Sequence, residues 1–213
     1  MANLTFMNQT IFDNGASAQL GSVLIEHGIR RPLLCTDKGL VNLGMVSQVV
    51  AHLGNDAALT IFDGTPENPT QWSVEEAVRL YQASRCDGVV ALGGGSSMDL
   101  AKAVALAVTH DGDLLEYTAG LGGAKNIGRV APLIAIPTTS GTGSEVSSGA
   151  VIIMKNGEKF SDENFILNNK DGYYLWKKEI KLQKIFFLQN IESALLSQKK
   201  VKVALKEKKP NLF

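Results

Sequence analysis

The sequence predicts an α/β fold with a parallel sheet, followed by a short tail of different character. Short apolar runs alternate with longer segments of helical period, and the alternation repeats at the length of a strand plus a crossover helix. Polar or glycine-rich loops follow three of the apolar runs. Both patterns stop near Lys159. We therefore expect an α/β domain over residues 1–159 and an atypical lysine-rich tail, helical or disordered, over residues 160–213.

The first half of the predicted domain alternates helices with strands. In chain order we expect a helix at 16–28, a strand at 31–37, a helix at 40–54, a strand at 57–63, a turn at 65–70, a helix at 73–84 and a strand at 87–92. Gly28 and Gly54 end the first two helices as C-terminal cap glycines would. Pro66 and Pro69 lack the amide hydrogen that a strand or a helix needs, so the segment around them should turn.

The third helix has a recognisable start, and the pattern then continues. Ser73 followed by Glu76 has the spacing of a capping box, so Ser73 should be the N-cap. After the strand at 87–92 we expect a helix from about Ser96, a glycine-rich segment at 119–128, a strand at 130–137, a loop at 138–146 and a strand at 150–153.

Charge and glycine content separate the two parts of the chain. Residues 1–154 hold 8 Lys and Arg against 14 Asp and Glu, whereas residues 155–213 hold 13 Lys, no Arg and 7 acidic residues. Nineteen of the 21 glycines and all three histidines lie in the first part. The tail contains an apolar and basic pattern at 176–200 that is typical of an amphipathic helix. It does not resemble a continuation of the α/β domain.

The composition of the whole chain excludes several classes of function. The formal net charge is zero, which gives no electrostatic reason to bind nucleic acid or an anionic membrane. No segment approaches the ~20 apolar residues of a membrane span, and the N-terminus lacks the basic region of a signal peptide. Cys35 and Cys86 adjoin apolar runs and are interpreted as buried free thiols of a reducing compartment. We expect a cytoplasmic protein, compatible with a homo-oligomer.

Three loops follow the ends of predicted parallel strands, and topology should bring them together. They are Thr36-Asp37, Gly93–Ser96 and Thr138–Ser144. In open α/β sheets the ligand lies outside the carboxyl ends of the strands. Three glycines before a helix would let a phosphate approach the backbone and accept hydrogen bonds from free amides. The alternative is a tight turn in which Ser96 is the N-cap and Asp99 lies at the third helical position.

The other two loops predict which nucleotide is bound. Asp37 could accept hydrogen bonds from an adenosine ribose and would repel a 2′-phosphate, which favours NAD over NADP. The alternative is that Asp37 is a solvated helix cap. The hydroxyls of the loop at 138–144 could donate to a phosphate or to a nicotinamide amide, or they could belong to a solvated loop.

Four motifs, taken in order, resemble the iron-containing alcohol dehydrogenase family. They are TDKGL at 36–40, ENPT at 67–70, GGGSSMDLAKAVA at 93–105 and PTTSGTGSEVSSGAVI at 137–152. The resemblance covers residues 5–159. It implies a dehydroquinate synthase-like nucleotide-binding domain for NAD(P). In the family an all-helical domain with a divalent metal follows, and hydride transfer takes place between the two domains.

The resemblance also implies roles for individual residues. Asp37 would contact the adenosine ribose, and Asn68 would lie in a turn near the cofactor. The diphosphate loop and its support would be Gly94, Gly95, Ser96 and Asp99. The second cofactor loop would contain Thr138, Thr139, Thr142 and Ser144. Val151 would make an apolar contact beside the nicotinamide, and Lys159 would contact the cofactor.

The sequence departs from the family at the metal. The family's metal is held by one Asp and three His of the helical domain, and this sequence has no histidine after His110. We therefore assign no metal ligands, although the resemblance implies Fe²⁺ or another divalent ion for the family. The histidines His27, His52 and His110 are interpreted as ordinary helix residues. A gene fusion, a read-through, a frame error or an evolved truncated module would each explain the tail.

The resemblance predicts an NAD-dependent oxidoreductase that interconverts a small alcohol and its aldehyde or ketone. The chain as written would be truncated and inactive alone. Two alternatives stay open: an NAD-binding module without turnover, and a relative of glycerol dehydrogenase.

Overall fold

The computed structural model describes residues 10–11, 15–53, 57–155, 165–166 and 184–186. Within these residues, six strands form one parallel sheet in the order β1-β8-β5-β4-β2-β3. The strands of this sheet are β1 (Thr10–Ile11), β2 (Pro32–Cys35), β3 (Thr60–Phe62), β4 (Gly88–Gly93), β5 (Leu133–Pro137) and β8 (Lys184–Phe186). The predicted α/β fold with a parallel sheet is confirmed.

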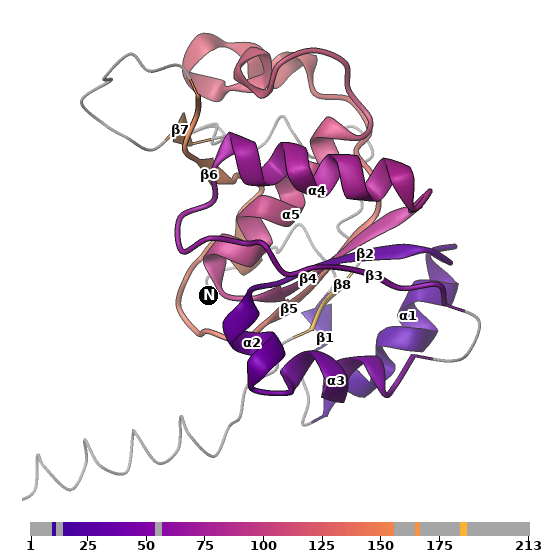
Figure 1. Cartoon of the computed structure of the whole chain (residues 1–213). Coiled ribbons are helices and arrows are strands. Elements are labelled where there is room, and N and C mark those ends of the chain that lie inside the picture. The colour runs from indigo at the N-terminus through magenta and orange to yellow at the C-terminus, as the bar shows by residue number, and fades with distance from the viewer. Residues whose placement is uncertain (1–9, 12–14, 54–56, 156–164, 167–183, 187–213) are drawn as a thin grey trace, which may run out of the picture.

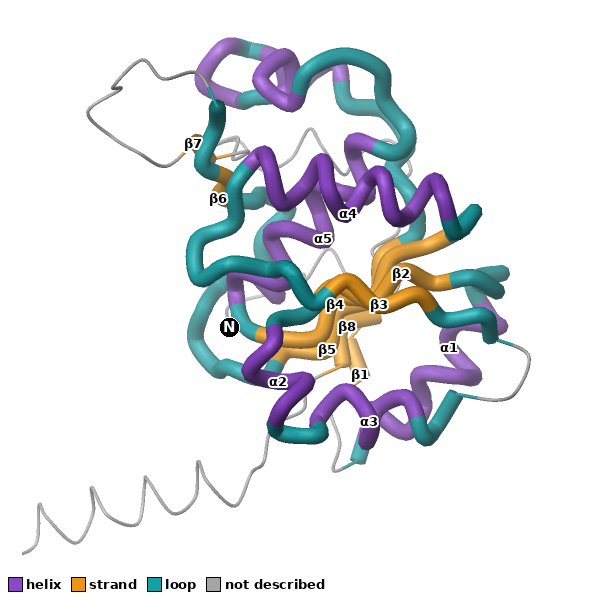
Figure 2. The backbone as a smooth tube through the Cα atoms, viewed as in Figure 1, coloured by secondary structure: helices purple, strands orange, loops and turns teal. Residues whose placement is uncertain are grey.

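Helices cover both faces of the sheet (Figures 1 and 2). Helices α1 (Leu20–Glu26), α2 (Lys38–Asn42) and α3 (Met45–Val50) lie below the strands in the view of Figure 1. Helices α4 (Gln71–Ala83) and α5 (Gly95–Ala107) lie above them. None of the described helices is both long enough and apolar enough to span a bilayer.

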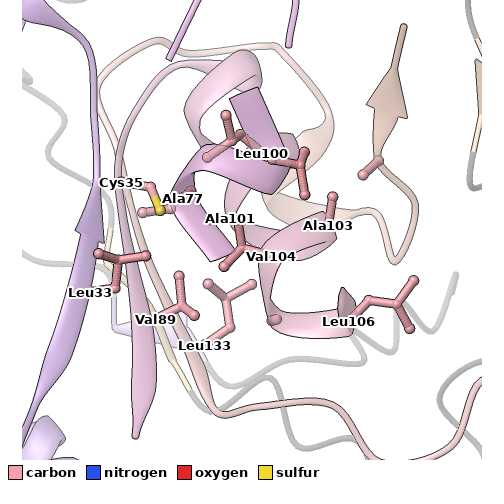
Figure 3. Packing of buried hydrophobic residues seen from close by; sticks show 14 of the residues in the cluster. Leu33, Cys35, Ala77, Val89, Leu100, Ala101, Ala103, Val104, Leu106 and Leu133 are labelled. Atoms are coloured by element: carbon pink, nitrogen blue, oxygen red, sulfur yellow. The ribbon is translucent and has the colours of Figure 1, made fainter. Parts of the chain in front are cut away.

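Alternate residues of the central strands build two separate hydrophobic cores. Successive side chains of a strand point to opposite faces, so every second residue shares a core. Leu33, Val89 and Leu133 pack with Ala77 of α4 and Val104 of α5, as Figure 3 shows. Leu34, Val90 and Ile134 instead belong to the core that contains residues of α1 and α3. Every residue of β4 and β5 is buried, which is typical of strands covered on both faces.

The first two predicted helices are each divided in the structure. The segment at 16–28 forms a 3₁₀ turn, Ala16–Gln19, followed by α1. The segment at 40–54 forms α2 and α3, separated by Gly44 with φ +72°. Only glycine adopts this conformation at little cost, so Gly44 breaks a helical pattern that is otherwise continuous. Gly54, predicted to end the helix, lies outside the described residues.

The N-cap of helix α4 lies three residues before the predicted one. Thr70 is its N-cap, and Thr70 Oγ1 accepts a hydrogen bond from Ser73 N at 3.2 Å. Ser73 Oγ in turn accepts from Thr70 N at 3.0 Å. Ser73 thus occupies the third helical position of a capping box, where glutamate or glutamine is more usual. The prediction of Ser73 as the N-cap was wrong because a serine can serve at either end of this exchange.

The later elements follow the prediction in order, with shorter bounds. The glycine-rich segment forms 3₁₀ turns at Ala119–Leu121 and Gly123–Asn126, after another at Leu114–Tyr117. The strand expected at 130–137 begins at Leu133. The strand expected at 150–153 is β6 (Val151–Ile152), which pairs antiparallel with β7 (Phe165–Ile166).

Most of the predicted amphipathic helix at 176–200 lies outside the described residues. Its three described residues, Lys184–Phe186, form strand β8 between β5 and β1, so the prediction of helix is wrong there. The domain boundary between residues 159 and 160 lies outside the described residues and stays a prediction.

Candidate functional site

The carboxyl ends of β2, β4 and β5 lie side by side and lead into the three loops that the sequence singled out. Cys35 of β2 is in register with Ala91 of β4, and Gly93 of β4 is in register with Pro137 of β5. Thr138 N also donates to Gly93 O at 2.9 Å. Parallel pairing therefore gathers the loops at one edge of the sheet.

Asp37 caps helix α2 at this edge. Its Oδ1 accepts a hydrogen bond from Leu40 N at 3.0 Å, so Asp37 is a helix cap, as one of the two predictions for this residue stated. Its Oδ2 makes no hydrogen bond among the described residues, and the side chain is half-buried. The preceding Thr36 hydroxyl is fully buried and has no hydrogen-bond partner in the described part of the chain. Capping thus leaves one oxygen of Asp37 available to a ligand.

Gly93 must be glycine for two separate reasons. Its φ is +152°, a conformation that side-chain-bearing residues rarely adopt. A Cβ atom there would lie 2.3 Å from Ser97 Oγ and 2.7 Å from Ser97 Cβ. Packing against the first turn of α5 therefore requires the first of the three glycines.

Gly94 and Gly95 let the start of α5 and the loop after β5 approach each other closely. A Cβ atom on Gly94 would lie 3.2 Å from Thr139 Oγ1, and one on Gly95 would lie 3.4 Å from Thr142 Cβ. Both glycines are only half-buried. The second and third glycines thus allow the two loops to lie close together.

The start of α5 presents amide groups that have no hydrogen-bond partner in the described part of the chain. Gly94 is the N-cap and has no side chain to satisfy them, and the first amide bonded back along the helix is Met98 N, to Gly94 O at 3.2 Å. The amides that precede Met98 in the first turn have no acceptor within the helix. With the helix dipole they form a site suited to an anion. A bare backbone and free donors fit the diphosphate of a dinucleotide.

The alternative in which Ser96 caps α5 is wrong. Ser96 is the second residue of the helix, and its Oγ donates to the carbonyl oxygen of Glu67. This bond ties the helix start to the turn at 65–70 and places the exposed Asn68 one residue from the contact. Asp99 is the fifth helical residue rather than the third, and it faces the loop after β5.

Asp99 and Lys102, one turn apart on α5, bind the segment from Ser144 to Val151. Asp99 Oδ1 accepts from Ser144 Oγ at 2.6 Å, and its Oδ2 accepts from Val151 N at 3.0 Å. Lys102 Nζ donates to Ser144 O, Ser144 Oγ and Gly149 O at 2.8, 2.8 and 2.7 Å. Burial lowers the pKa of Lys102 to about 8, although Asp99 and Glu145 act in the opposite direction.

Sequence reasoning passed over Lys102, although a signal was present. It is a single cation within the alanine-rich run DLAKAVALA, three residues after an aspartate. A charged residue on a face that is otherwise apolar needs a buried partner, and the spacing of three identifies it.

Some hydroxyl groups of the loop after β5 are already hydrogen-bonded to other residues of the protein. Thr142 Oγ1 donates to Glu145 Oε2 at 2.7 Å and accepts from Ser144 N at 3.2 Å. Ser144 is buried, and its hydroxyl is taken by Asp99 and Lys102. Thr138 is half-buried and Thr139 is exposed, so these two are better placed to meet a ligand. Lys159 lies outside the described residues.

The described residues do not fit the metal that the resemblance implies. They contain no group of three or more His, Cys, Asp or Glu able to hold a metal ion. His110 is engaged otherwise: its Nε2 accepts from Gly128 N at 2.7 Å, and its ring packs edge-on against Tyr117.

Comparison with known proteins gives consistent similarities. The family model of iron-containing alcohol dehydrogenase matches residues 8–165. A 4-hydroxybutyrate dehydrogenase of Cupriavidus necator is 46% identical over 173 residues, which cover 81% of this chain and 45% of that protein.

Solved structures of similar enzymes share the fold. A 1,3-propanediol oxidoreductase superposes with a TM-score of 0.70 at 27% identity, covering 88% of this chain and 46% of that chain. The NADH-dependent butanol dehydrogenase A of Thermotoga maritima gives 0.71 at 25% identity, covering 88% and 44%. The chain thus spans about half the length of the relatives that it matches.

Proposed function

Because this chain belongs to the iron-containing alcohol dehydrogenase family, we propose that the edge formed by its three loops binds NAD for an alcohol dehydrogenase reaction. The observation that carries the proposal is the bare start of α5, where Gly94 and Gly95 leave amide donors uncovered. A nicotinamide cofactor supplies the carbon that accepts or donates the hydride, and the protein positions it.

Different residues of the site would contact different parts of the cofactor. The amides at the start of α5, from Gly94 to Ser96, would donate to the diphosphate. Asp37 Oδ2 would accept from a hydroxyl of the adenosine ribose and would repel a 2′-phosphate, so NAD is favoured over NADP.

Further contacts would orient the nicotinamide half. Thr138 and Thr139 would donate hydroxyl groups, and Val151 would offer an apolar contact. Thr142, Ser144 and Asp99 would act by fixing the loop, since their polar atoms are bound to one another or to neighbours. Asn68 would approach through the turn that Ser96 holds. We keep Lys159 as a cofactor contact on the resemblance alone.

The substrate class follows from the relatives. The 4-hydroxybutyrate, 1,3-propanediol and butanol enzymes carry names of small hydroxyl compounds. We propose a small alcohol and its aldehyde or ketone as substrates of the whole protein. We also propose a cytoplasmic location, because the two buried cysteines are free thiols, which suit a reducing compartment. A homo-oligomer without nucleic-acid or membrane partners is part of the same proposal.

Titration calorimetry of the full chain with NADH tests the cofactor site. Gly95→Val places a branched side chain against Thr142 and should weaken binding by about tenfold or more, since about 1.4 kcal/mol corresponds to tenfold. Ala107→Val is the matched control, because it adds a branched residue at the other end of the same helix. NADH affinity that is equal in the two variants would reject the phosphate site at the helix start.

A further inference from the structure

Lys102 connects helix α5, whose first turn is the proposed diphosphate site, to the loop after β5. Its side chain is only 10% exposed, and its three donors reach three acceptors on the segment from Ser144 to Gly149. An ammonium group has three N–H donors, so this arrangement uses every one of them. The lysine is therefore fully satisfied only while it is protonated.

Asp99 closes the same network from one turn away. Asp99 accepts a hydrogen bond from the Ser144 hydroxyl, which in turn accepts one from Lys102, and it also accepts a hydrogen bond from Val151 N at 3.0 Å. Asp99 Oδ1 lies 3.5 Å from Lys102 Nζ. The network thus fixes both ends of the segment 144–151 to a helix whose first turn is the anion site.

Among the described residues, the charged groups that act on Lys102 come from two elements. Asp99 lies on α5 itself, and Glu145 lies in the turn Ser144–Val146. Strands β4, β5 and β6 contribute only apolar residues, and α4 presents Val74 and Ala77 to the same core. Such surroundings disfavour the charge, and the pKa of Lys102 falls to about 8.

We propose that Lys102 is a positioning residue for the cofactor, and that its ammonium group holds the loop after β5 in register with the start of α5. This inference rests on the proposed NAD site. A neutral amine has two N–H donors and a lone pair, so loss of the proton leaves one of the three acceptors without a donor. The loop is then held less firmly, and the two walls of the site no longer stay aligned.

Binding and protonation are coupled as a consequence. If the cofactor needs the aligned loop, it binds the protonated state better, and by linkage its binding raises the pKa of Lys102. The negative diphosphate at the start of the same helix acts in the same direction. At pH 9, where free Lys102 is mostly neutral, NADH binding should take up a fraction of a proton, about 0.4 for a tenfold coupling. At pH 6.5 this uptake should vanish.

Calorimetry of the full chain with NADH, in buffers of different ionisation enthalpy, measures this uptake directly. We expect Lys102→Met to bind NADH about tenfold or more weakly at pH 7 and to lose the uptake at pH 9, because charge-assisted bonds to the loop are removed. Lys125→Met is the matched control, since it removes an exposed lysine, and it should keep both values. A purely structural lysine would leave the proton uptake of the wild type at zero.

Ser144→Ala keeps the test decisive if Lys102→Met does not fold. It removes one of the three acceptors, so the two donors of a neutral amine suffice for the two carbonyls that remain. Proton uptake should therefore fall although Lys102 is present. No NADH binding by the wild type would reject the proposed function, and the inference with it. Tight binding without proton uptake at pH 9, or with equal uptake in wild type and Ser144→Ala, would reject the role of Lys102 alone.

Discussion

Replacing Gly93 with alanine should destabilise the fold by about 2–6 kcal/mol, which is large for the addition of one methyl group. Two costs combine. A residue with a side chain at φ +152° is strained by about 1–3 kcal/mol. The new Cβ would also lie 2.3 Å from Ser97 Oγ, and overpacking of this kind costs about 1–3 kcal/mol.

A control variant separates the two costs. Gly44 also has positive φ, at +72°, but a Cβ there meets nothing within 4 Å. Gly44→Ala should therefore show strain alone, about 1–2 kcal/mol. Urea unfolding followed by circular dichroism gives the midpoints and slopes from which both free energies of unfolding are obtained.

The close approach to Ser97 can be tested in the same assay. In a double-mutant cycle, Ser97→Gly should recover part of the loss in Gly93→Ala, because it removes the two nearest atoms that the new Cβ would meet. If Gly93→Ala costs no more than Gly44→Ala and the cycle shows no coupling, packing against α5 is not the reason for the glycine.

Three further predictions concern ligands and pH. Asp37→Ala should narrow the preference for NADH over NADPH in calorimetry, because the carboxylate that repels the 2′-phosphate is gone; an unchanged ratio would remove Asp37 from the site. The lowered pKa of Lys102 means that the unfolded chain binds more protons above about pH 8, so the free energy of unfolding should gain a contribution as pH rises from about 8 to 10, and Lys102→Met should lose it. The full chain loaded anaerobically with Fe²⁺ should bind less than one equivalent tightly and reduce no NAD with short-chain alcohols, since its three histidines all precede residue 111. Stoichiometric iron with turnover would contradict that expectation.

Strands β2, β4 and β5 and the three loops could be predicted because local sequence decides them. The apolar runs that became β4 and β5 are buried on both faces, and in such strands hydrophobicity alone marks the element. The three consecutive glycines Gly93–Gly95 precede a predicted helix, and this pattern by itself predicts a close approach to the backbone.

What the sequence could not predict depends on tertiary contacts. Gly44 breaks a helix only because the chain must turn there. The spacing of apolar residues continues across Gly44 and therefore does not predict the break. The hydroxyls of Thr142 and Ser144 looked available for a ligand, but residues on a distant helix and in the next turn occupy them. Lys102 gains its role from a segment more than 40 positions away in the chain. The assignments of individual cofactor contacts stay predictions.

The hydrogen bond from Ser96 to Glu67 has a consequence for the thermodynamics of association. It joins the turn at 65–70 to α5, while Lys102 and Asp99 join α5 to the loop after β5. The walls of the site are thus cross-linked before any nucleotide arrives, and little conformational entropy remains to be lost on binding. Such preorganisation predicts a heat-capacity change that reflects only the apolar area covered on binding, and not the greater change that accompanies folding coupled to binding.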